Sequence, residues 1–239
     1  MMSAKWLGVR GCDAEWMDDA AQGEEAFGAA LRDLEFLNRV TFGYWPTLRW
    51  LDRLATRTGA TRFSVLDVGA GGGDMLRSIA RWGAARGITL ELTGLDRSPA
   101  AATAAHRAGT PGAWLVADLF DLPADASYDV GISALFAHHL ADADLVRFLR
   151  WMDRHARIGW LINDIHRHAV PWAVLWAGTR LLRLDPMVVH DSTISVARAF
   201  TRADWQCLAA KAGVDARIAW RFPFRWAVSQ GPVSRGAAA

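Results

Sequence analysis

A glycine-rich segment at residues 65–74 constrains the fold more than any other part of the chain. It reads Val-Leu-Asp-Val-Gly-Ala-Gly-Gly-Gly-Asp, a β-rich hydrophobic run followed directly by glycines. Glycine permits backbone angles and close ligand approach that a side chain would block. In doubly wound α/β folds, such a turn at the end of the first strand is where a nucleotide-like cofactor lies. The segment therefore predicts an α/β protein with a cofactor site at this turn.

The chain after residue 60 alternates between strand and helix patterns. Strands are predicted at 63–68, 90–95, 114–117 and 128–135, with a fifth ending at 163, and helices at 75–82, 99–107 and 142–155. Strands separated by helices of roughly 10–15 residues imply a parallel sheet covered on both faces. Two short strands, bent around residues 222–224, are expected near the C-terminus.

Other segments interrupt this alternation. Residues 1–22 show no period and are expected to form a loose arm, whereas helical spacing is visible over 24–40 and from Pro46 onward. A helix beginning at Pro171 is expected to stop at residues 184–186, and Thr201 is expected to cap a last helix. We therefore expect residues 1–58 to form an N-terminal arm with lid helices. Residues 59–239 should form the main domain, with a helical insertion at 170–200.

Composition limits the classes of function. The 239 residues suit one domain with a full core. The net charge of +2, from 27 basic and 25 acidic residues, is too balanced for a nucleic-acid protein. Thirteen tryptophans against two tyrosines favour an apolar or aromatic ligand.

Cysteine usage and hydropathy indicate a cytoplasmic protein. Cys12 and Cys207 lie far apart in the sequence without zinc-site spacing, which suits a reducing compartment. The first residues do not resemble a signal peptide. The longest apolar run, 169–178, is about half of the ~20 residues that a transmembrane helix needs.

Three acids and the glycine pattern distinguish between cofactors. A dinucleotide fingerprint, G-x-G-x-x-G, fails because its third glycine would fall on Asp74. Asp67 instead stands two residues before the first glycine of a G-x-G-x-G pattern. Asp96 follows the second strand, where an acid can accept ribose hydroxyl protons, and Asp118 follows the third. A carboxylate at three consecutive strand ends would favour a ligand that carries positive charge.

This combination resembles motif I of the class I S-adenosylmethionine-dependent methyltransferases, and residues 59–239 would be the catalytic domain. The small-molecule branch related to ubiquinone and menaquinone biosynthesis is most similar, because there a His-His-Leu follows the fourth strand, as at residues 138–140. The resemblance implies a seven-stranded, mostly parallel, Rossmann-like sheet with its last strand antiparallel. It also implies S-adenosylmethionine as cofactor, with Asp118 accepting from the adenine amino group. The implied cofactor residues are Asp67, Gly69, Ala70, Gly71, Asp96, Arg97, Asp118, Leu119, Ser133 and Ala134.

The exit of the fourth strand bears on the acceptor. The sequence there is Ser133-Ala134-Leu135-Phe136, not the Asn/Asp-Pro-Pro-aromatic pattern typical of DNA and protein N-methyltransferases, and no cysteine nucleophile lies nearby. We therefore expect O-methylation of a hydroxylated aromatic or quinone-like small molecule. C-methylation of a similar acceptor, or a non-catalytic scaffold that binds the cofactor, stays open as an alternative.

Histidines gather after the predicted fourth and fifth strands. An imidazole can accept the proton of a phenol or enol at neutral pH. His139 or His166 is the expected base, with His138 as a further candidate and Asp164 as the supporting acid. No metal is expected, because the imidazoles at the fourth-strand exit suit magnesium poorly.

The irregular segments are expected to close the acceptor pocket. Their candidate substrate residues are Arg39, Tyr44, Trp45, Trp172 and Trp176. Arg180 and Arg183, beside the apolar face of the insertion, also allow a transient membrane-surface contact.

Overall fold

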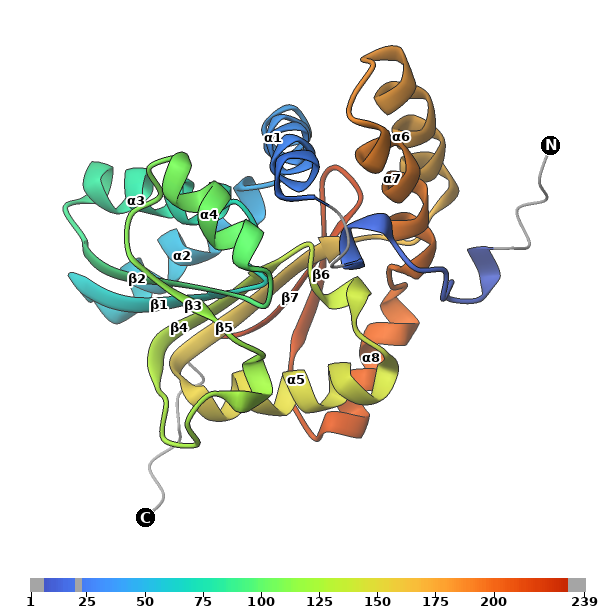
Figure 1. The fold of residues 1–239 in the computed structure, drawn as a ribbon. Helices are drawn as coiled ribbons and strands as arrows, with labels where there is room; N and C mark the ends of the chain where they lie inside the picture. The colour runs from blue at the N-terminus through green and yellow to red at the C-terminus, as the bar shows by residue number, and fades with distance from the viewer. Residues whose placement is uncertain (1–6, 20–22, 232–239) are drawn as a thin grey trace.

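The computed structural model describes residues 7–19 and 23–231 and shows one sheet with helices on both of its faces (Figure 1). The sheet has seven strands in the order β3-β2-β1-β4-β5-β7-β6. The strands are β1 (Arg62–Val68), β2 (Thr89–Asp96), β3 (Ala113–Val116), β4 (Tyr128–Ala134), β5 (Ala156–Ile165), β6 (Arg217–Arg221) and β7 (Arg225–Gln230).

Helices connect the strands and extend beyond the sheet. The α-helices are α1 (Glu24–Val40), α2 (Trp45–Thr58), α3 (Asp74–Arg86), α4 (Pro99–Arg107), α5 (Asp142–His155), α6 (Ala169–Leu181), α7 (Pro186–Arg198) and α8 (Arg202–Ala212). Short 3-10 turns are η2 (Trp16–Asp18), η3 (Leu119–Asp121) and η4 (Ala137–His139).

The strand directions confirm the predicted doubly wound, mostly parallel sheet. β1 pairs in parallel with β2 and β4, β2 with β3, and β4 with β5. β7 runs antiparallel to both β5 and β6. The two strands predicted around Phe222 are this β6–β7 hairpin. Because the chain turns back there, β7 enters the sheet in the opposite direction.

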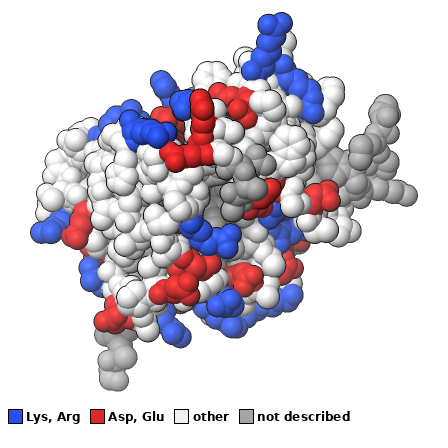
Figure 2. Space-filling view, in the orientation of Figure 1, with Lys and Arg blue, Asp and Glu red and all other residues white. Residues whose placement is uncertain are grey.

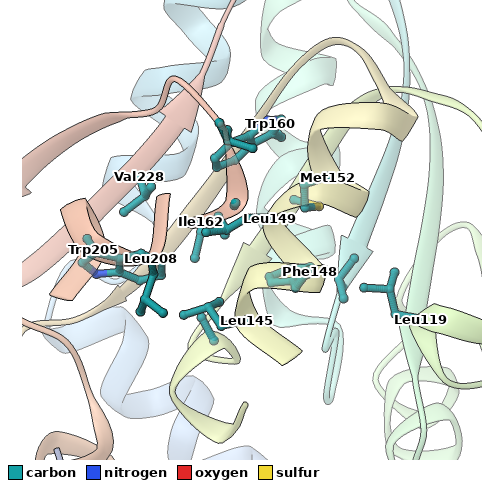
Figure 3. Packing of buried hydrophobic residues seen from close by; sticks show 14 of the residues in the cluster. Leu119, Leu145, Phe148, Leu149, Met152, Trp160, Ile162, Trp205, Leu208 and Val228 are labelled. Atoms are coloured by element: carbon teal, nitrogen blue, oxygen red, sulfur yellow. The ribbon is translucent and has the colours of Figure 1, made fainter. Parts of the chain in front are cut away.

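Side chains of β1 alternate between two cores, as a strand buried on both faces requires. Phe63 and Val65 pack with α2 and α3 on one face, whereas Leu66 and Val68 face α5 and α8 on the other. Figure 3 shows the second core, where side chains from the sheet and from both helices converge, among them Phe148, Leu149, Trp160, Ile162, Trp205 and Leu208. These cores fix the strands whose carboxyl ends carry the predicted site residues.

Helices α6 and α7 project from the sheet as a pair (Figure 1). Helix α7 differs from the sequence expectation, which took residues 184–186 only as a helix stop. Asp185 is the N-cap of α7, and its side chain accepts from the Met187 N–H, while Pro186 occupies the first turn. Asp followed by Pro is a helix-start signal as well as a stop signal.

The expectation of a loose N-terminal arm is wrong for residues 7–19. The Gly11 N–H donates to the Ala197 carbonyl at 2.9 Å, and Arg167 Nε donates to the Leu7 carbonyl at 3.0 Å. Glu15 is only 3% exposed. Long-range contacts fix this segment although its sequence has no period. Residues 1–6 and 20–22 of the expected arm lie outside the described residues.

The surface matches the balanced composition. On the face drawn in Figure 2, basic and acidic side chains are interspersed. Among the described residues, no helix is both long and apolar enough to cross a membrane.

Candidate functional site

The glycine-rich turn is held against the end of β2 by backbone donors. The N–H groups of Gly69 and Ala70 donate to the Leu95 carbonyl at 2.9 and 3.0 Å. The Gly71 N–H donates to Asp96 Oδ2 at 2.9 Å. Gly69 and Gly71 have φ angles of 72° and 50°, a region that disfavours residues with a side chain. The turn therefore has a fixed shape that depends on glycine.

Phe136, just after β4, covers the first glycine of the turn. A Cβ atom at Gly69 would lie 2.6 Å from the Phe136 ring. The ring is thus a wall of this sheet edge, and sequence analysis did not single it out. The only sequence signal for it was its position beside the expected cofactor residues Ser133 and Ala134.

Asp67 is a buried acid without a hydrogen-bond partner for its Oδ1 atom within the described part of the chain. Burial, together with Asp74 and Asp96 nearby, raises the pKa of Asp67 well above its usual range. A buried polar group without a partner is costly. A ligand with a positive charge or a donor at this edge would satisfy the carboxyl group.

Asp96 uses both carboxylate oxygens to organise the local backbone. Oδ1 accepts from the Ser98 N–H and Oδ2 from the Gly71 N–H, both at 2.9 Å. Burial raises the pKa of Asp96, although these hydrogen bonds act in the opposite direction. A carboxylate has about four lone-pair sites, so two stay available for hydroxyl donors.

Asp118 and Arg97 lie together at the ends of β3 and β2. Asp118 Oδ1 accepts from the Phe120 N–H at 2.9 Å, and Oδ2 lies 3.7 Å from Arg97 Nη1. The Asp118 side chain is partly exposed. Asp118 therefore keeps acceptor capacity at the edge where the resemblance expects the adenine amino group.

The remaining expected cofactor residues have no side-chain polar group available for a ligand, so only their main-chain groups could bind one. Ser133 is buried, and its hydroxyl donates to the Val68 carbonyl at 2.9 Å. Leu119 is part of the core, and Ala134 ends β4. Contacts from these three positions to a ligand would have to come from the main chain.

Helix α1 closes over the glycine-rich turn. The Leu31 side chain lies 3.4 Å from where a Cβ atom on Gly71 would be. Asn38 Nδ2 and the Tyr44 hydroxyl donate to the same atom, Asp74 Oδ2, at 3.0 and 2.8 Å. Burial and the Asp74 charge raise the pKa of Tyr44, so its hydroxyl keeps its proton. Tyr44 thus anchors the lid at the start of α3.

The other expected acceptor residues lie on several surfaces. Arg39 is exposed at the end of α1, and Trp45 is half exposed at the start of α2, with the Arg49 guanidinium 5.3 Å from its ring centroid. Trp172 and Trp176 stack on each other along α6, with centroids 6.4 Å apart. Trp172 and Trp176 therefore form an aromatic pair on the insertion, whereas Arg39 on α1 and Trp45 on α2 lie apart from this pair.

His138 is oriented by Asp164. Asp164 Oδ1 lies 2.7 Å from His138 Nδ1, and Oδ2 accepts from the His138 backbone N–H at 2.9 Å. Burial alone would raise the pKa of Asp164, but the charge and hydrogen bond of His138 outweigh it, so this pKa lies below its usual range. The ionised carboxylate can only accept, so Nδ1 donates the hydrogen bond, and in the neutral imidazole this leaves the lone pair on Nε2. Asp164 therefore orients His138 rather than His139 or His166.

His139 is oriented by an acid from the N-terminal segment. Asp18 Oδ1 lies 2.8 Å from His139 Nδ1. Burial would raise the pKa of Asp18, but His139 and Arg198 outweigh it, so this pKa is low. The His139 ring also stacks on Phe136, with centroids 6.5 Å apart, and Phe136 covers Gly69, so this ring lies on the side of the glycine-rich turn. The sequence did not predict Asp18, which lies 121 positions away in the chain.

Glu15 lies between the two imidazoles. Its Oε1 is 3.8 Å from His138 Nε2, and its Oε2 is 3.8 Å from His139 Nε2. Oε2 accepts from the Ser195 hydroxyl at 2.9 Å, whereas Oε1 has no hydrogen-bond partner among the described residues. Burial raises the pKa of Glu15 to about 7. We call Glu15, Asp18, His138, His139 and Asp164 the histidine cluster.

His166 lies outside the histidine cluster. Its ring packs edge-on against Trp226, with centroids 4.9 Å apart, and its Nδ1 is buried without a hydrogen-bond partner in the described structure. Burial, with His168 and Arg167 nearby, lowers the pKa of His166. His166 is therefore neutral at physiological pH, but Asp164 does not support it.

Solved structures show the same fold. The plantazolicin methyltransferase BpumL, in complex with a triazolic desmethylPZN analog and SAH, is 16% identical over 82% of this chain and 78% of that chain, with a TM-score of 0.60. A SAM-dependent methyltransferase from Aquifex aeolicus is 16% identical over 84% of this chain and 96% of that chain, with a TM-score of 0.59. A protein from Nostoc punctiforme PCC 73102 is 16% identical over 70% of this chain, with a TM-score of 0.50, and the chain covers only 51% of its length.

The sheet order, the antiparallel last strand and the glycine-rich turn together define the fold of the class I S-adenosylmethionine-dependent methyltransferases. Residues 65–159, from β1 to β5, match the methyltransferase domain family. This match agrees with the methyltransferase resemblance that the sequence predicts. No curated protein matches the chain.

Proposed function

We propose that the protein transfers the methyl group of S-adenosylmethionine to a hydroxyl group of a hydroxylated aromatic or quinone-like small molecule. The methyltransferase domain and its fold support the cofactor. BpumL, of the same fold, binds a triazolic desmethylPZN analog together with SAH, so this fold accommodates a second ligand beside the demethylated cofactor. The stacked tryptophan pair of α6, of which Trp176 is exposed and Trp172 is half-buried, offers aromatic surface for a ring-containing acceptor.

The cofactor residues fit the chemistry of the proposed ligand. The Asp67 carboxyl group lacks a hydrogen-bond partner for Oδ1 among the described residues. At Gly69 a side chain would clash with Phe136, and at Gly71 the positive φ angle disfavours one. Asp96 and Asp118 keep acceptor capacity for ribose hydroxyl and adenine amino groups. The bound cofactor would supply an electrophilic methyl group on a sulfonium, and the protein must align the acceptor with it. Alignment of this kind can contribute roughly 7–11 kcal/mol.

The histidine cluster would activate the acceptor hydroxyl. In methylation of a phenol or enol, the oxygen must lose its proton. An imidazole can accept that proton directly, or imidazoles can hold a metal ion that makes the hydroxyl more acidic. Of the two imidazoles, His139 is the more accessible, because its side chain is 23% exposed and that of His138 is 3% exposed.

The irregular segments would form the lid. Helix α1 contacts the glycine-rich turn through Leu31, and Arg198 at the end of α7 donates to the carbonyls of His138 and His139. A closed lid excludes water from the reacting atoms and strengthens electrostatic interactions inside the site. We assign the catalytic domain to residues 59–239.

One observation carries the proposal. The His139 ring stacks on the ring of Phe136, with centroids 6.5 Å apart, and Phe136 covers Gly69 of the glycine-rich turn. Acceptor activation and cofactor binding therefore meet on one edge of the sheet.

A screen of phenols, quinols and related C–H acceptors with methyl-labelled S-adenosylmethionine tests the proposal. We expect the label on an oxygen of at least one phenol or quinol, and no transfer with the Asp96→Ala variant. Label on carbon alone, or no transfer by folded protein that binds the cofactor, would overturn it.

A further inference from the structure

Three side chains of the histidine cluster converge on a single point. The ligand atoms of Glu15, His138 and His139 all lie within 4.8 Å of one another. They come from distant parts of the chain, the N-terminal segment and the turn after β4. Both imidazoles direct Nε2 toward the Glu15 carboxylate at 3.8 Å.

Each imidazole is held in the orientation that a metal ligand needs. Asp164 accepts from Nδ1 of His138, and Asp18 accepts from Nδ1 of His139. A carboxylate at Nδ1 fixes the tautomer and leaves the Nε2 lone pair free, which is the usual outer arrangement around metal-bound histidine. The carboxylates of Asp164 and Asp18 therefore orient the two imidazoles so that both Nε2 atoms could bind the same metal ion.

Glu15 keeps an oxygen for a ligand although cations lie near the cluster. Arg198 Nη1 lies 2.8 Å from Asp18 Oδ2 and 3.7 Å from Glu15 Oε1. Asp164 interacts electrostatically with Arg10 and Arg225. Glu15 Oε1 nevertheless accepts no hydrogen bond among the described residues.

One divalent ion would satisfy three groups together. It would bind the Nε2 atoms of His138 and His139 and the Oε1 atom of Glu15, which accepts no hydrogen bond among the described residues.

We propose that Glu15, His138 and His139 bind one divalent transition-metal ion, such as Zn²⁺ or Fe²⁺. Two imidazoles and one carboxylate are a ligand set of zinc enzymes and of non-haem iron sites, and they leave a coordination position open. Ligands at about 2.1 Å from one ion lie roughly 3.0–3.4 Å apart, so small side-chain rotations complete the site. Magnesium, which prefers oxygen ligands, is not the ion expected here.

The ion would also explain how the acceptor is activated, and this part rests on the proposed function. Bound there, the ion would make the acceptor hydroxyl more acidic, so its O–H bond would break more easily and its proton would pass to solvent water before the lid closes. The acceptor oxygen would then form its bond to the methyl carbon while the methyl–sulfur bond breaks and S-adenosylhomocysteine leaves. Metal ions lower the pKa of bound hydroxyl groups by such coordination.

Metal titration of the full chain tests the site directly. Protein stripped with a chelator is titrated with Zn²⁺ by calorimetry and with Co²⁺ by its visible absorption. We expect one ion per chain, and binding weakened by roughly 10–100-fold in Asp18→Asn, which changes only the outer carboxylate. Glu15→Gln and His139→Ala should weaken it further.

Matched controls are Glu25→Gln and His106→Ala, the same substitutions at exposed positions. They should bind as the original chain does. If Glu15→Gln does not fold, the metal affinities of His139→Ala and His106→Ala are compared instead. The His139 side chain is partly exposed, so its replacement should leave the protein folded. Absence of binding by folded protein, or equal binding by the His139 and His106 variants, would overturn the metal site. Binding of SAH is measured on the same stripped protein, so failure of the metal site and failure of the proposed cofactor are distinguished.

Discussion

Asp96 Oδ2 accepts a hydrogen bond of 2.9 Å from the backbone N–H of Gly71, which ties the end of β2 to the turn after β1. One carboxylate therefore both shapes the glycine-rich turn and keeps lone pairs for a ligand. The two functions of Asp96 lead to a direct prediction.

Asp96→Ala should weaken cofactor binding strongly. Loss of one hydrogen bond to a charged group costs about 1.5–3 kcal/mol, which corresponds to roughly 10–100-fold in affinity. Calorimetry with SAH measures the change. Glu91→Ala, on the same strand but exposed, is the control and should bind normally. Equal affinities of the two variants would contradict the assignment of Asp96.

Gly69→Ala should destabilise the protein more than Gly87→Ala. Both glycines have positive φ angles, but a Cβ atom at Gly69 would meet the Phe136 ring at 2.6 Å, whereas nothing lies within 4 Å at Gly87. Backbone strain costs roughly 1–2 kcal/mol at either position, and overpacking adds about 1–3 kcal/mol at Gly69 alone. Urea denaturation measures both variants. A double variant with Phe136→Ala should recover part of the difference, and no recovery would show that the ring is not the cause.

Tyr44→Phe should loosen the lid. The change removes a 2.8 Å hydrogen bond to Asp74, worth about 1 kcal/mol, while Asn38 still donates to the same oxygen. We expect SAH to dissociate several-fold faster, as stopped-flow fluorescence would show. Tyr128→Phe, at the other tyrosine of the chain, is the control. Unchanged dissociation in Tyr44→Phe would mean that α1 does not gate the cofactor.

His139→Ala should reduce turnover far more than His166→Ala. His139 belongs to the histidine cluster, whereas His166 packs on Trp226 apart from Asp164. Loss of acceptor activation corresponds to roughly 10²–10⁴-fold in rate. Cofactor affinity should stay within about twofold, since the affected step follows binding. A larger loss of turnover in the His166 variant would contradict this assignment and would indicate that His166, at the end of β5, activates the acceptor.

Asp129→Asn should lower stability in a pH-dependent way. Burial would raise the pKa of Asp129, but hydrogen bonds from Ser64 and Arg157 outweigh it and lower this pKa. A depressed pKa contributes stability that is present above the unfolded value of about 4 and is lost as pH falls through the folded value. The variant should be less stable by about 1–2 kcal/mol at neutral pH, and the difference should shrink toward about pH 3. A constant difference across this range would contradict the hydrogen-bonded carboxylate.

The sequence predicts the sheet well because its signals are local. The limits of α1, α4 and α5 agree with the sequence prediction, since periodic apolar residues and Pro99 mark them. Asp67, Asp96 and Asp118 were found by their position after β-rich runs. Parallel strands bring such positions to one edge, so the cofactor edge follows from sequence order.

The histidine cluster could be predicted only in part. His138, His139 and Asp164 were candidates because they follow two adjacent strands. Glu15 and Asp18 carried no signal, because single residues in an aperiodic segment do not show what they contact. The pairing of Asp164 with His138 rather than its near neighbour His166 depends on how the turn after β4 folds, and spacing does not reveal this.

Helix α7 was missed for a different reason. Asp185-Pro186 ends one helix and starts the next, and the stop signal alone was considered. The α6–α7 pair therefore looked like a single helical insertion.

Calorimetric titration of the full chain with SAH tests the central claim, that the carboxyl edge between Asp67 and Asp118 binds the adenosyl cofactor. The account predicts saturable binding at one site per chain, lost or greatly weakened in Asp96→Ala and retained in Glu91→Ala. Absence of any saturable heat with folded protein, or full binding by Asp96→Ala, would contradict it.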